Sequence, residues 1–381
     1  MKFALFYHSF VSCWNHGNAH FLRGLARALH ARGHRVAVHE PADGWSRMNA
    51  LREPGGAAVL HECAGLVPGI ELHSYALAAL DLDRALDGAD VVIAHEWNDP
   101  ALIERLGERR RRGGRFLLFF HDTHHRAVSA PDDLDRFDLT SFDAVLAFGE
   151  VLSSVYRERG WGRRAVTWHE AADVALFAPQ PDVRKAVDLI WIGNWGDGER
   201  DQELQHFLVE PAVQAGASVR LNGVRYPEIV SRKLRRLGFS LGGWLPNHRA
   251  PAAFAEARLT VHVPRRPYVE ALQGIPTIRM FEALACGIPL VSAPWADIEG
   301  LFPDGSYLKA RSGDEMKAAI RAVLHDPDMA AAIAAAGSRA VAERHTCSHR
   351  ADELLALAHR LRPAASTAAP TPREADRMVM S

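Results

Sequence analysis

The sequence lacks most of the features that mark secreted, membrane-spanning and nucleic-acid-binding proteins. Its 381 residues include only four cysteines, far apart and with no pair at CxxC spacing, so we expect neither a disulfide scaffold nor a cysteine-rich zinc site. There is no run of 18 apolar residues, which argues against a membrane span. The formal net charge is −1, so no excess positive charge favours nucleic acid as a partner. These absences predict a soluble, cytoplasmic protein.

Short apolar segments alternate with helical patterns along the chain. The amino terminus, MKFALFYHSF, is apolar only as far as His8 and no small-residue cleavage site follows, so we expect a buried first strand rather than a signal peptide. Alternating strands and helices predict a parallel sheet covered on both faces. Strands are expected at residues 3–7, 35–39, 91–94, 116–120, 144–148 and 165–168, and then at 188–192, 218–221, 259–263, 289–292 and 306–309. Helices are expected at 18–33, 315–325 and 329–343.

The two series of strands are separated by a proline-rich break at residues 178–181. The predicted fold class is therefore α/β, with two Rossmann-like, doubly wound parallel-sheet domains that face each other across a cleft. We expect an N-terminal domain over residues 1–178 and a C-terminal domain over 179–363, whose last helix packs back on the first domain. Residues 364–381, rich in Ala, Pro, Ser and Thr, are predicted to be a disordered tail. Ligands bind such folds at the carboxyl ends of the strands.

Residues 273–295, QGIPTIRMFEALACGIPLVSAPW, predict a helix followed by a strand. The helix starts after Thr277 and ends at Gly287, and Pro289 prevents its continuation. Arg279 and Glu282 are three residues apart and share one face. Free N–H groups at the helix start, together with Arg279, form an anion site, and Glu282 could accept hydrogen bonds from a ribose diol. The alternative is a surface Arg–Glu pair contributing only about 0.3–0.5 kcal/mol.

The run FEALACGIPLVSAP within this stretch resembles the EAxACGxPVV motif of nucleotide-sugar glycosyltransferases of the GT-B fold. The spacing R-x-x-E-A-x-A-C-G is most similar to the CgeB-like, spore-maturation-type branch of the group 1 glycosyltransferases. The resemblance implies that Glu282 binds the donor ribose, that residues 179–363 bind the nucleotide sugar, and that residues 1–178 form the acceptor side. Many members carry another Glu eight residues before this one, where this chain has Gly274, with Glu270 nearby. The resemblance therefore supports donor binding more than the details of catalysis.

Two strand ends of the N-terminal domain supply candidate site residues. The stretch from His16 to Val36 resembles the glycine-rich opening GGAE…LARALAARGHEV of the same enzymes, which implies that Gly17 and Asn18 lie near the donor phosphates and that His16 is a catalytic candidate. An ordinary turn capped by Asn18 is the alternative. His121 and Asp122 match the strand-end His-Asp of related transferases, in which the histidine faces the sugar or acceptor. A histidine there could take the acceptor proton.

A metal site at the histidine-rich segment 121–125 is the competing interpretation. Adjacent residues such as His124 and His125 rarely point at one ion, and no HExxH-type helix accompanies them. We therefore predict no metal ligands and no cofactor. The neighbouring strand end, His95-Glu96-Trp97-Asn98, either lines the acceptor side or is a capped loop before a helix.

Loops of the C-terminal domain supply the other donor-binding candidates. The loop at residues 193–200, GNWGDGER, permits a backbone curl, and the resemblance assigns its Arg200 to the diphosphate. Residues 243–247, GWLPN, resemble a segment whose backbone pairs with the nucleobase, although Trp244 could instead be core. Arg265 or Arg266 either contacts phosphate or caps the sheet. The full donor-binding set is Gly17, Asn18, Gly193, Asn194, Trp195, Arg200, Asn222, Trp244, Leu245, Thr277, Arg279 and Glu282.

These predictions combine into one function, a metal-independent transfer of a sugar from a nucleotide diphosphate sugar to an unidentified acceptor, whether glycan, lipid, protein or small molecule. Arg200, Arg279 and the helix start would stabilise the leaving diphosphate. The alternatives are a nucleotide-sugar epimerase or hydrolase, and a non-catalytic nucleotide-sugar-binding protein. The arginines at residues 109–112 suggest either peripheral membrane contact or, as we prefer, a solvated helix end.

Overall fold

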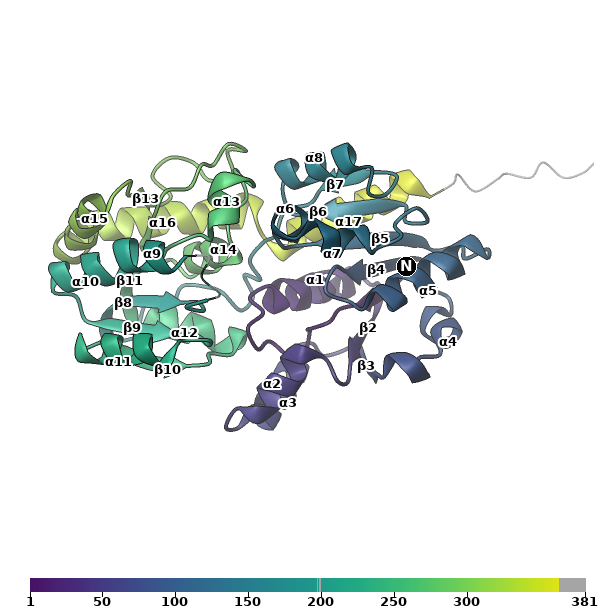
Figure 1. The fold of residues 1–381 in the computed structure, drawn as a ribbon, viewed down its shortest axis with the longest axis horizontal. Helices are drawn as coiled ribbons and strands as arrows, with labels where there is room; N and C mark the ends of the chain where they lie inside the picture. Colours follow the sequence, from purple (N-terminus) through teal and green to yellow (C-terminus); the bar gives the residue numbers. More distant parts are fainter. Residues whose placement is uncertain (197, 199, 363–381) are drawn as a thin grey trace, which may run out of the picture.

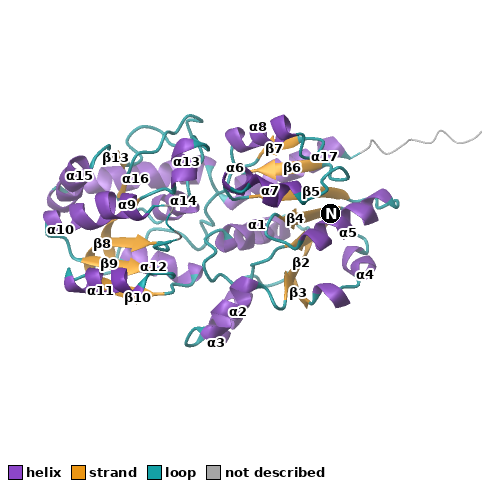
Figure 2. Cartoon of the chain, viewed as in Figure 1, coloured by secondary structure: helices purple, strands orange, loops and turns teal. Residues whose placement is uncertain are grey.

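Two parallel sheets, each covered by helices, make up the protein in a computed structural model that describes residues 1–196, 198 and 200–362. Figures 1 and 2 show the two halves side by side, with strands at the centre of each and helices outside. The predicted fold class, two doubly wound α/β domains, is confirmed. The tail predicted at 364–381 lies outside the described residues.

The N-terminal sheet has seven strands in the order β3-β2-β1-β4-β5-β6-β7, and every pair is parallel. Alternate residues of β1 point to opposite faces, so Phe3 and Leu5 join one buried cluster while Ala4 and Phe6 join another. The strands are β1 Lys2–Phe6, β2 Arg35–Pro41, β3 Glu71–Tyr75, β4 Val91–His95, β5 Leu117–Asp122, β6 Ala144–Ala147 and β7 Ala165–Thr167. The helices are α1 Ala19–Ala31, α2 Trp45–Arg52, α3 Gly56–Gly65, η1 Leu77–Ala79, α4 Leu82–Leu86, α5 Pro100–Arg111, α6 Arg126–Ser129, α7 Pro131–Asp135 and α8 Glu150–Arg159.

The C-terminal sheet has six strands in the order β10-β9-β8-β11-β12-β13, again all parallel. Its strands are β8 Val187–Ile192, β9 Val219–Asn222, β10 Ser240–Gly243, β11 Ala257–His262, β12 Leu290–Ser292 and β13 Leu308–Lys309. Its helices are α9 Asp201–Leu204, η2 Gln205–Val209, α10 Glu210–Ala215, α11 Glu228–Arg236, η3 Asn247–Arg249, α12 Ala250–Ala255, α13 Arg266–Glu270, α14 Ile278–Ala285, α15 Gly313–His325, α16 Pro327–Arg344 and α17 Cys347–Leu361.

Two edge strands, β3 and β10, have no counterpart in the sequence prediction. Residues Glu71–Tyr75 are exposed along almost their whole length, and Ser240–Gly243 contains two glycines and is also mostly exposed. A strand at a sheet edge needs no continuous apolar run, so its residues give little hydrophobic signal.

The last helix, α17, lies on the N-terminal domain, where Figure 1 shows it in yellow within that half of the molecule. It packs on α1, and its Leu354 is fully buried. The Trp168 indole N–H donates to Arg350 O at 3.0 Å, and Arg32 Nε donates to Asp352 Oδ1 at 2.8 Å. The chain therefore passes between the halves twice, after β7 and before α17, and one apolar cluster runs through both.

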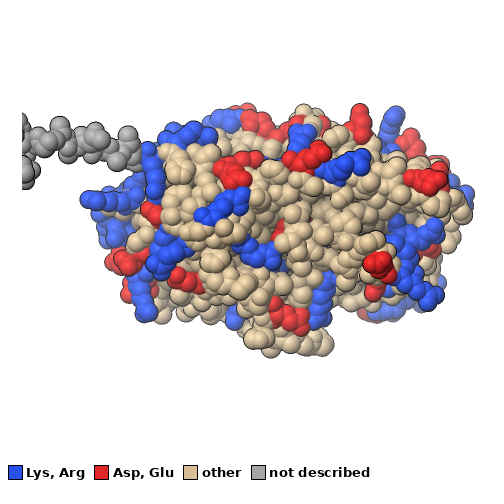
Figure 3. Space-filling view, turned by 180° about the vertical axis from the view of Figure 1, so that it is seen from behind, with Lys and Arg blue, Asp and Glu red and all other residues tan. Residues whose placement is uncertain are grey.

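Surface charges are mixed in sign. On the face shown in Figure 3, basic and acidic side chains are interspersed over both halves. The arginine run at residues 109–112 pairs with Asp83, Asp143, Asp138 and Glu108. Its positive charge is therefore matched by carboxylates, as expected of a solvated helix end rather than a basic membrane patch. Within the described part of the chain, no helix is both long and apolar enough to cross a membrane.

The packing of α17 gives a first prediction. Leu354→Ala should lower the free energy of unfolding by about 2–5 kcal/mol, because it leaves a cavity between α17 and α1. Leu237→Ala, at a leucine that is 40% exposed, should change it by less than about 0.5 kcal/mol. Urea unfolding followed by circular dichroism measures both. Equal effects of the two substitutions would contradict the docking of α17.

Candidate active site

A cleft of about 770 Å³ opens between the carboxyl edges of the two sheets and is lined by both domains. Most residues singled out from the sequence lie on its wall. Eleven of them do so: His16, Gly17, Asn18, Gly193, Asn194, Arg200, Asn222, Trp244, Leu245, Thr277 and Arg279. Four predicted residues, His121, Asp122, Trp195 and Glu282, do not line the cleft and are buried. The structure thus brings together loops from both sheets around one space.

The start of α14 and the loop after β1 meet inside this cleft. Thr277 precedes the helix in an extended conformation, with no side-chain capping bond. A Cβ on Gly17 would lie 2.8 Å from Ile278 Cγ2 and 3.6 Å from Arg279 Nη2, so only glycine permits this approach without displacement. Asn18 makes no capping bond to α1 and lines the cleft instead. The alternative of an Asn18-capped turn is therefore wrong.

Glu282 is fully buried and has a polar partner on each of two sides. Its carboxylate bonds to the Arg279 guanidinium one turn earlier, and its Oε1 lies 3.0 Å from His20 Nδ1 of α1 in the other domain. The same Nδ1 is 3.0 Å from Gly17 O, and because both neighbours are acceptors this nitrogen carries the proton. Burial alone would raise the pKa of Glu282, but Arg279 and His20 outweigh it and the pKa is lowered. The pair is therefore not the weak surface pair of the alternative interpretation.

Arg200 is held at the end of β8 by carbonyl groups and an aromatic ring. It donates to Val263 O at 3.0 Å and to Asn194 O at 2.8 Å, and its guanidinium carbon lies 5.1 Å from the centre of the Trp191 ring. Trp195, three residues after β8, is 5% exposed and packs near Tyr226. It therefore supports the loop from behind and does not face a ligand.

His121 and Asp122 lie beneath the cleft rather than on its wall, which corrects the catalytic placement expected for them. Both are fully buried. The His121 ring is 4.9 Å from Trp168 and 5.3 Å from His95, centre to centre. Asp122 accepts hydrogen bonds from Tyr156 Oη at 2.7 Å and His124 N at 2.9 Å. Burial, followed by the nearby Glu96, raises the pKa of Asp122 to about 7. In this arrangement the two residues support the wall and have no surface through which to reach a sugar.

Glu170 is an acidic cleft residue that sequence reasoning missed. It follows β7 by three residues, lines the cleft, and is only 3% exposed. Burial raises its pKa well above the ordinary value, and the negative charges of Glu282 and Glu96 add to the effect. A buried carboxyl group of this kind can exchange a proton near neutral pH. Its position after a strand was the available signal, although the segment Trp168-His169-Glu170 resembles no known motif.

At Gly274, where related enzymes carry a Glu, the structure leaves no room for a side chain. The residue has φ +95°, and a Cβ would lie 2.7 Å from Ile298 Cγ1. Beside it, the Glu299 carboxylate accepts from Glu150 N at 3.0 Å and lies 2.7 Å from His169 Nε2. Glu299 therefore ties the C-terminal domain to the start of α8, while Glu270 is exposed and does not line the cleft.

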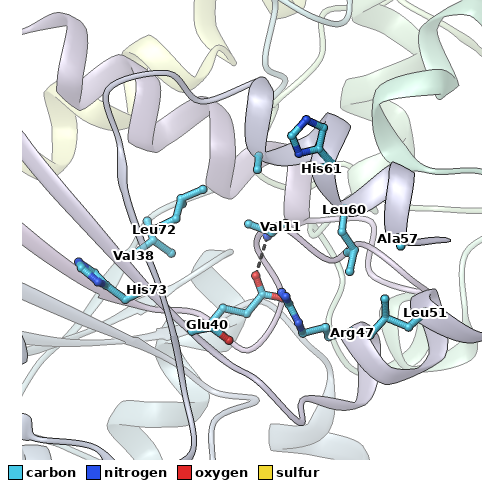
Figure 4. Close-up of a pocket in the computed structure, with 12 residues that line it drawn as sticks. Val11, Val38, Glu40, Arg47, Leu51, Ala57, Leu60, His61, Leu72 and His73 are labelled. Atoms are coloured by element: carbon cyan, nitrogen blue, oxygen red, sulfur yellow. Dashed lines mark hydrogen bonds between the residues drawn. The ribbon is translucent and has the colours of Figure 1, made fainter.

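A smaller cavity of about 430 Å³ lies beside the cleft, between β2, β3 and the α2–α3 pair. Figure 4 shows Glu40 at its base pointing toward Val11, with apolar side chains around it. Glu40 accepts from Val11 N at 2.7 Å, Ser12 N at 3.2 Å and Ser12 Oγ at 2.6 Å. This carboxylate thus fixes the start of the loop that carries His16 and Gly17.

Comparison with known proteins shows which proteins this chain resembles. Residues 200–356 match a family model described as glycosyl transferase-like, whereas no curated protein sequence matches the chain. Among solved structures, sucrose-phosphate synthase from Thermosynechococcus elongatus is 16% identical with a TM-score of 0.67, covering 95% of this chain and 99% of its own.

Two further structures have the same architecture. Anabaena HepE in complex with UDP is 16% identical with a TM-score of 0.64, covering 94% of this chain and 100% of its own. T4 phage β-glucosyltransferase in complex with UDP-glucose is 11% identical with a TM-score of 0.59, covering 95% and 100%. Because the sequence identities are only 11–16%, the similarity to these three structures shows a shared fold and nothing more.

The fold is that of the GT-B glycosyltransferases, and the segment that matches the glycosyl transferase-like model contains both Arg200 and Arg279 of the cleft. The resemblance found in the sequence, to CgeB-like and group 1 GT-B glycosyltransferases, is confirmed.

The buried ion pairs of Glu282 give a second prediction. Glu282→Gln should lower the free energy of unfolding by about 1–3 kcal/mol at pH 7, because Arg279 and His20 lose their shared carboxylate. The folded-state pKa of Glu282 is lowered from 4.5, so its contribution is present above that pH and disappears as pH falls through the lowered value. The difference between wild type and variant should therefore shrink below pH 4.5.

Urea unfolding at a series of pH values measures this difference. Glu228→Gln is the matched control, since the Glu228 side chain is 73% exposed and lies 3.7 Å from Arg232. It should change stability by less than about 0.5 kcal/mol at every pH. A Glu282→Gln effect that grows toward low pH would contradict the assignment.

Proposed function

We propose that this protein transfers a sugar from a nucleotide diphosphate sugar to an acceptor held by the N-terminal domain. The observation that carries the proposal is the meeting of Arg200, Arg279 and the start of α14 on one wall of the interdomain cleft. Two cations and free helix N–H groups there suit a diphosphate. The UDP and UDP-glucose complexes of HepE and T4 β-glucosyltransferase support trying uridine nucleotides first.

We assign each candidate residue a part in donor binding. Arg279 and Arg200 would neutralise charge as the diphosphate leaves, without a metal ion at the phosphates. Glu282, being buried and paired, would act on the ribose only by positioning Arg279 and the helix start. Asn222, Trp244 and Leu245 line the cleft beyond β9 and β10 and would surround the base. Gly193, Asn194 and Gly17 would let backbone approach the donor closely.

Fewer residues can be assigned a role on the acceptor side of the cleft. Glu170, which lines the cleft there, is our candidate for exchanging a proton with the acceptor. His16 also lines this part of the cleft, so its predicted role stays a proposal. The acceptor class, whether glycan, lipid, protein or small molecule, is not indicated. The four cysteines are free and buried, which supports the proposed reducing, cytoplasmic location.

The donor site gives a third prediction. Arg200→Ala and Arg279→Ala should each raise the Kd for UDP about 10- to 100-fold, the effect of losing a charged hydrogen bond of about 1.5–3 kcal/mol. Arg266→Ala should leave it unchanged, because Arg266 pairs with Glu203 at 2.7 Å and does not line the cleft. Isothermal titration calorimetry with UDP, GDP and dTDP in the presence of EDTA measures these affinities.

Circular dichroism confirms that each variant is folded. If wild type binds none of the three nucleotides, or if Arg266→Ala weakens binding as much as Arg200→Ala, the proposed donor site is wrong. Loss of UDP binding on addition of EDTA would remove the proposal that the diphosphate needs no metal.

Two alternatives remain to be tested with intact donor. An epimerase or hydrolase on the same fold would convert UDP-glucose or release UDP quickly without any acceptor. A non-catalytic binding protein would bind UDP yet show no turnover with any acceptor pool. Chromatography of donor incubations with and without acceptor separates these outcomes from transfer.

A further inference from the structure

Three histidines from separate segments come together at the N-terminal side of the cleft: two line its wall and the third is fully buried against them. His8 follows β1, His95 is the last residue of β4, and His16 lies in the loop between β1 and α1. One ring nitrogen from each lies within 4.8 Å of the others. Ring centres are 4.4 Å apart for His8 and His16 and 5.0 Å apart for His8 and His95. We call these three residues the histidine cluster.

The cluster occupies the position in a doubly wound sheet where ligands bind. In the order β3-β2-β1-β4-β5, the direction of the strand connections reverses between β1 and β4. The crevice outside such a reversal is the usual ligand site of this architecture. His8 and His16 line the cleft there.

The ring nitrogens of the cluster are available to a ligand. No described residue offers a hydrogen bond to either nitrogen of His16 or to Nδ1 of His8, although all three atoms are buried. Buried polar atoms without partners are uncommon in folded proteins. The loop holds this arrangement at a conformational cost, because Asn15, just before His16, has φ +52°.

His95 is positioned through its Nδ1 by the adjacent residues Glu96 and Trp97, whose backbone N–H donates to Nδ1 at 3.4 Å. Glu96 Oε2 lies 2.5 Å from His95 Nδ1, which leaves Nε2 to face a ligand. Nε2 is 3.1 Å from Thr123 Oγ1, but that hydroxyl can donate instead to Glu96 Oε1 at 3.2 Å. If Nε2 of His95 bound an ion instead, the Thr123 hydroxyl would therefore still have a hydrogen-bond partner.

We propose that the histidine cluster binds one Zn²⁺ ion through three imidazole nitrogens, with a fourth position open to the cleft. Imidazole is a preferred Zn²⁺ ligand, and three protein ligands with an open position are typical of catalytic rather than structural zinc. Zn–N bonds are about 2.0–2.1 Å long, so the three ring nitrogens would have to move closer to one another by roughly 1 Å to share one ion.

Charge and location fit an ion on the acceptor side. Burial first, and then neighbouring positive groups, lowers the pKa of all three histidines, so they are neutral at pH 7 and have lone pairs to donate. The positive charge of Arg126 opposes the ion, and the Glu96 carboxyl group, whose pKa burial raises to about 8, offsets that charge once it is deprotonated. His16 adjoins Gly17, which faces Arg279, so the open position would meet an acceptor oxygen next to the donor phosphates. The proposal does not depend on the donor assignment.

The test uses the full chain, stripped of metal by a chelator and free of any affinity tag, titrated with ZnCl₂ or CoCl₂ alone. We expect one Zn²⁺ per chain by calorimetry and elemental analysis, and the intense visible d–d absorption of four-coordinate Co²⁺. His8→Ala and His16→Ala should each weaken binding more than about 100-fold, and Glu96→Gln about 10- to 100-fold. His124→Ala is the matched control, because His124 also lines the cleft but lies outside the cluster; it should bind Zn²⁺ as wild type does.

The outcomes separate a specific site from binding by the other histidines. No Zn²⁺ uptake by wild type at micromolar concentrations overturns the proposal, as does uptake that persists in the His8→Ala/His16→Ala double variant. An equal loss in His124→Ala also overturns it. Circular dichroism of the same variants checks their folding without any ligand, so failure of the zinc site is distinguishable both from misfolding and from failure of the donor site.

Discussion

The buried carboxylate of Glu282 is the constraint on which the cleft depends. A charge with no solvent contact is tolerated only if it is paired and hydrogen-bonded, and its two partners come from different domains, His20 from α1 and Arg279 from α14. Satisfying the charge therefore fixes how α14 approaches the N-terminal domain. It also aims Arg279 at the cleft and requires Gly17 to pass close to Ile278.

Other carboxylate–histidine pairs cross between the halves around the same cleft. Glu299 lies 2.7 Å from His169, and Glu62 of α3 lies 2.7 Å from His248 of η3. Together with the docking of α17, they hold the two sheets with their carboxyl edges facing. Any movement that separates the two domains must break such pairs. Helix α17 can remain in place during such a movement, because it packs on α1 of the N-terminal domain. The partly exposed pair at Glu62 costs less to separate than the buried one at Glu282.

The parts of the site that sequence predicted are those encoded locally. The helix start, Arg279, Glu282 and Gly287 lie within one short segment, so their spacing, together with the resemblance to the GT-B motif, predicts an anion site at the start of a helix. Buried strands such as β1 and β5 were equally visible, since they are continuous apolar runs. Edge strands β3 and β10 could not be predicted, because their residues are mostly exposed and form no apolar run. Sequence also located His121 and Asp122 at a strand end without showing that both are fully buried, with Asp122 bonded to Tyr156.

The acceptor wall could not be predicted in the same way, for a physical reason. A diphosphate is recognised largely by backbone N–H groups and fixed cations, which a short contiguous motif can supply. The N-terminal wall is instead made of side chains from separate elements, such as His8 after β1 and Glu170 after β7, and the buried His95 at the end of β4 packs against His8. Only the strand order brings them together, and that order follows from tertiary packing rather than spacing. The residues on the N-terminal side of the cleft are therefore brought together by the topology of the first sheet, whereas Arg279 and Glu282 lie one turn apart on a single helix of the second domain.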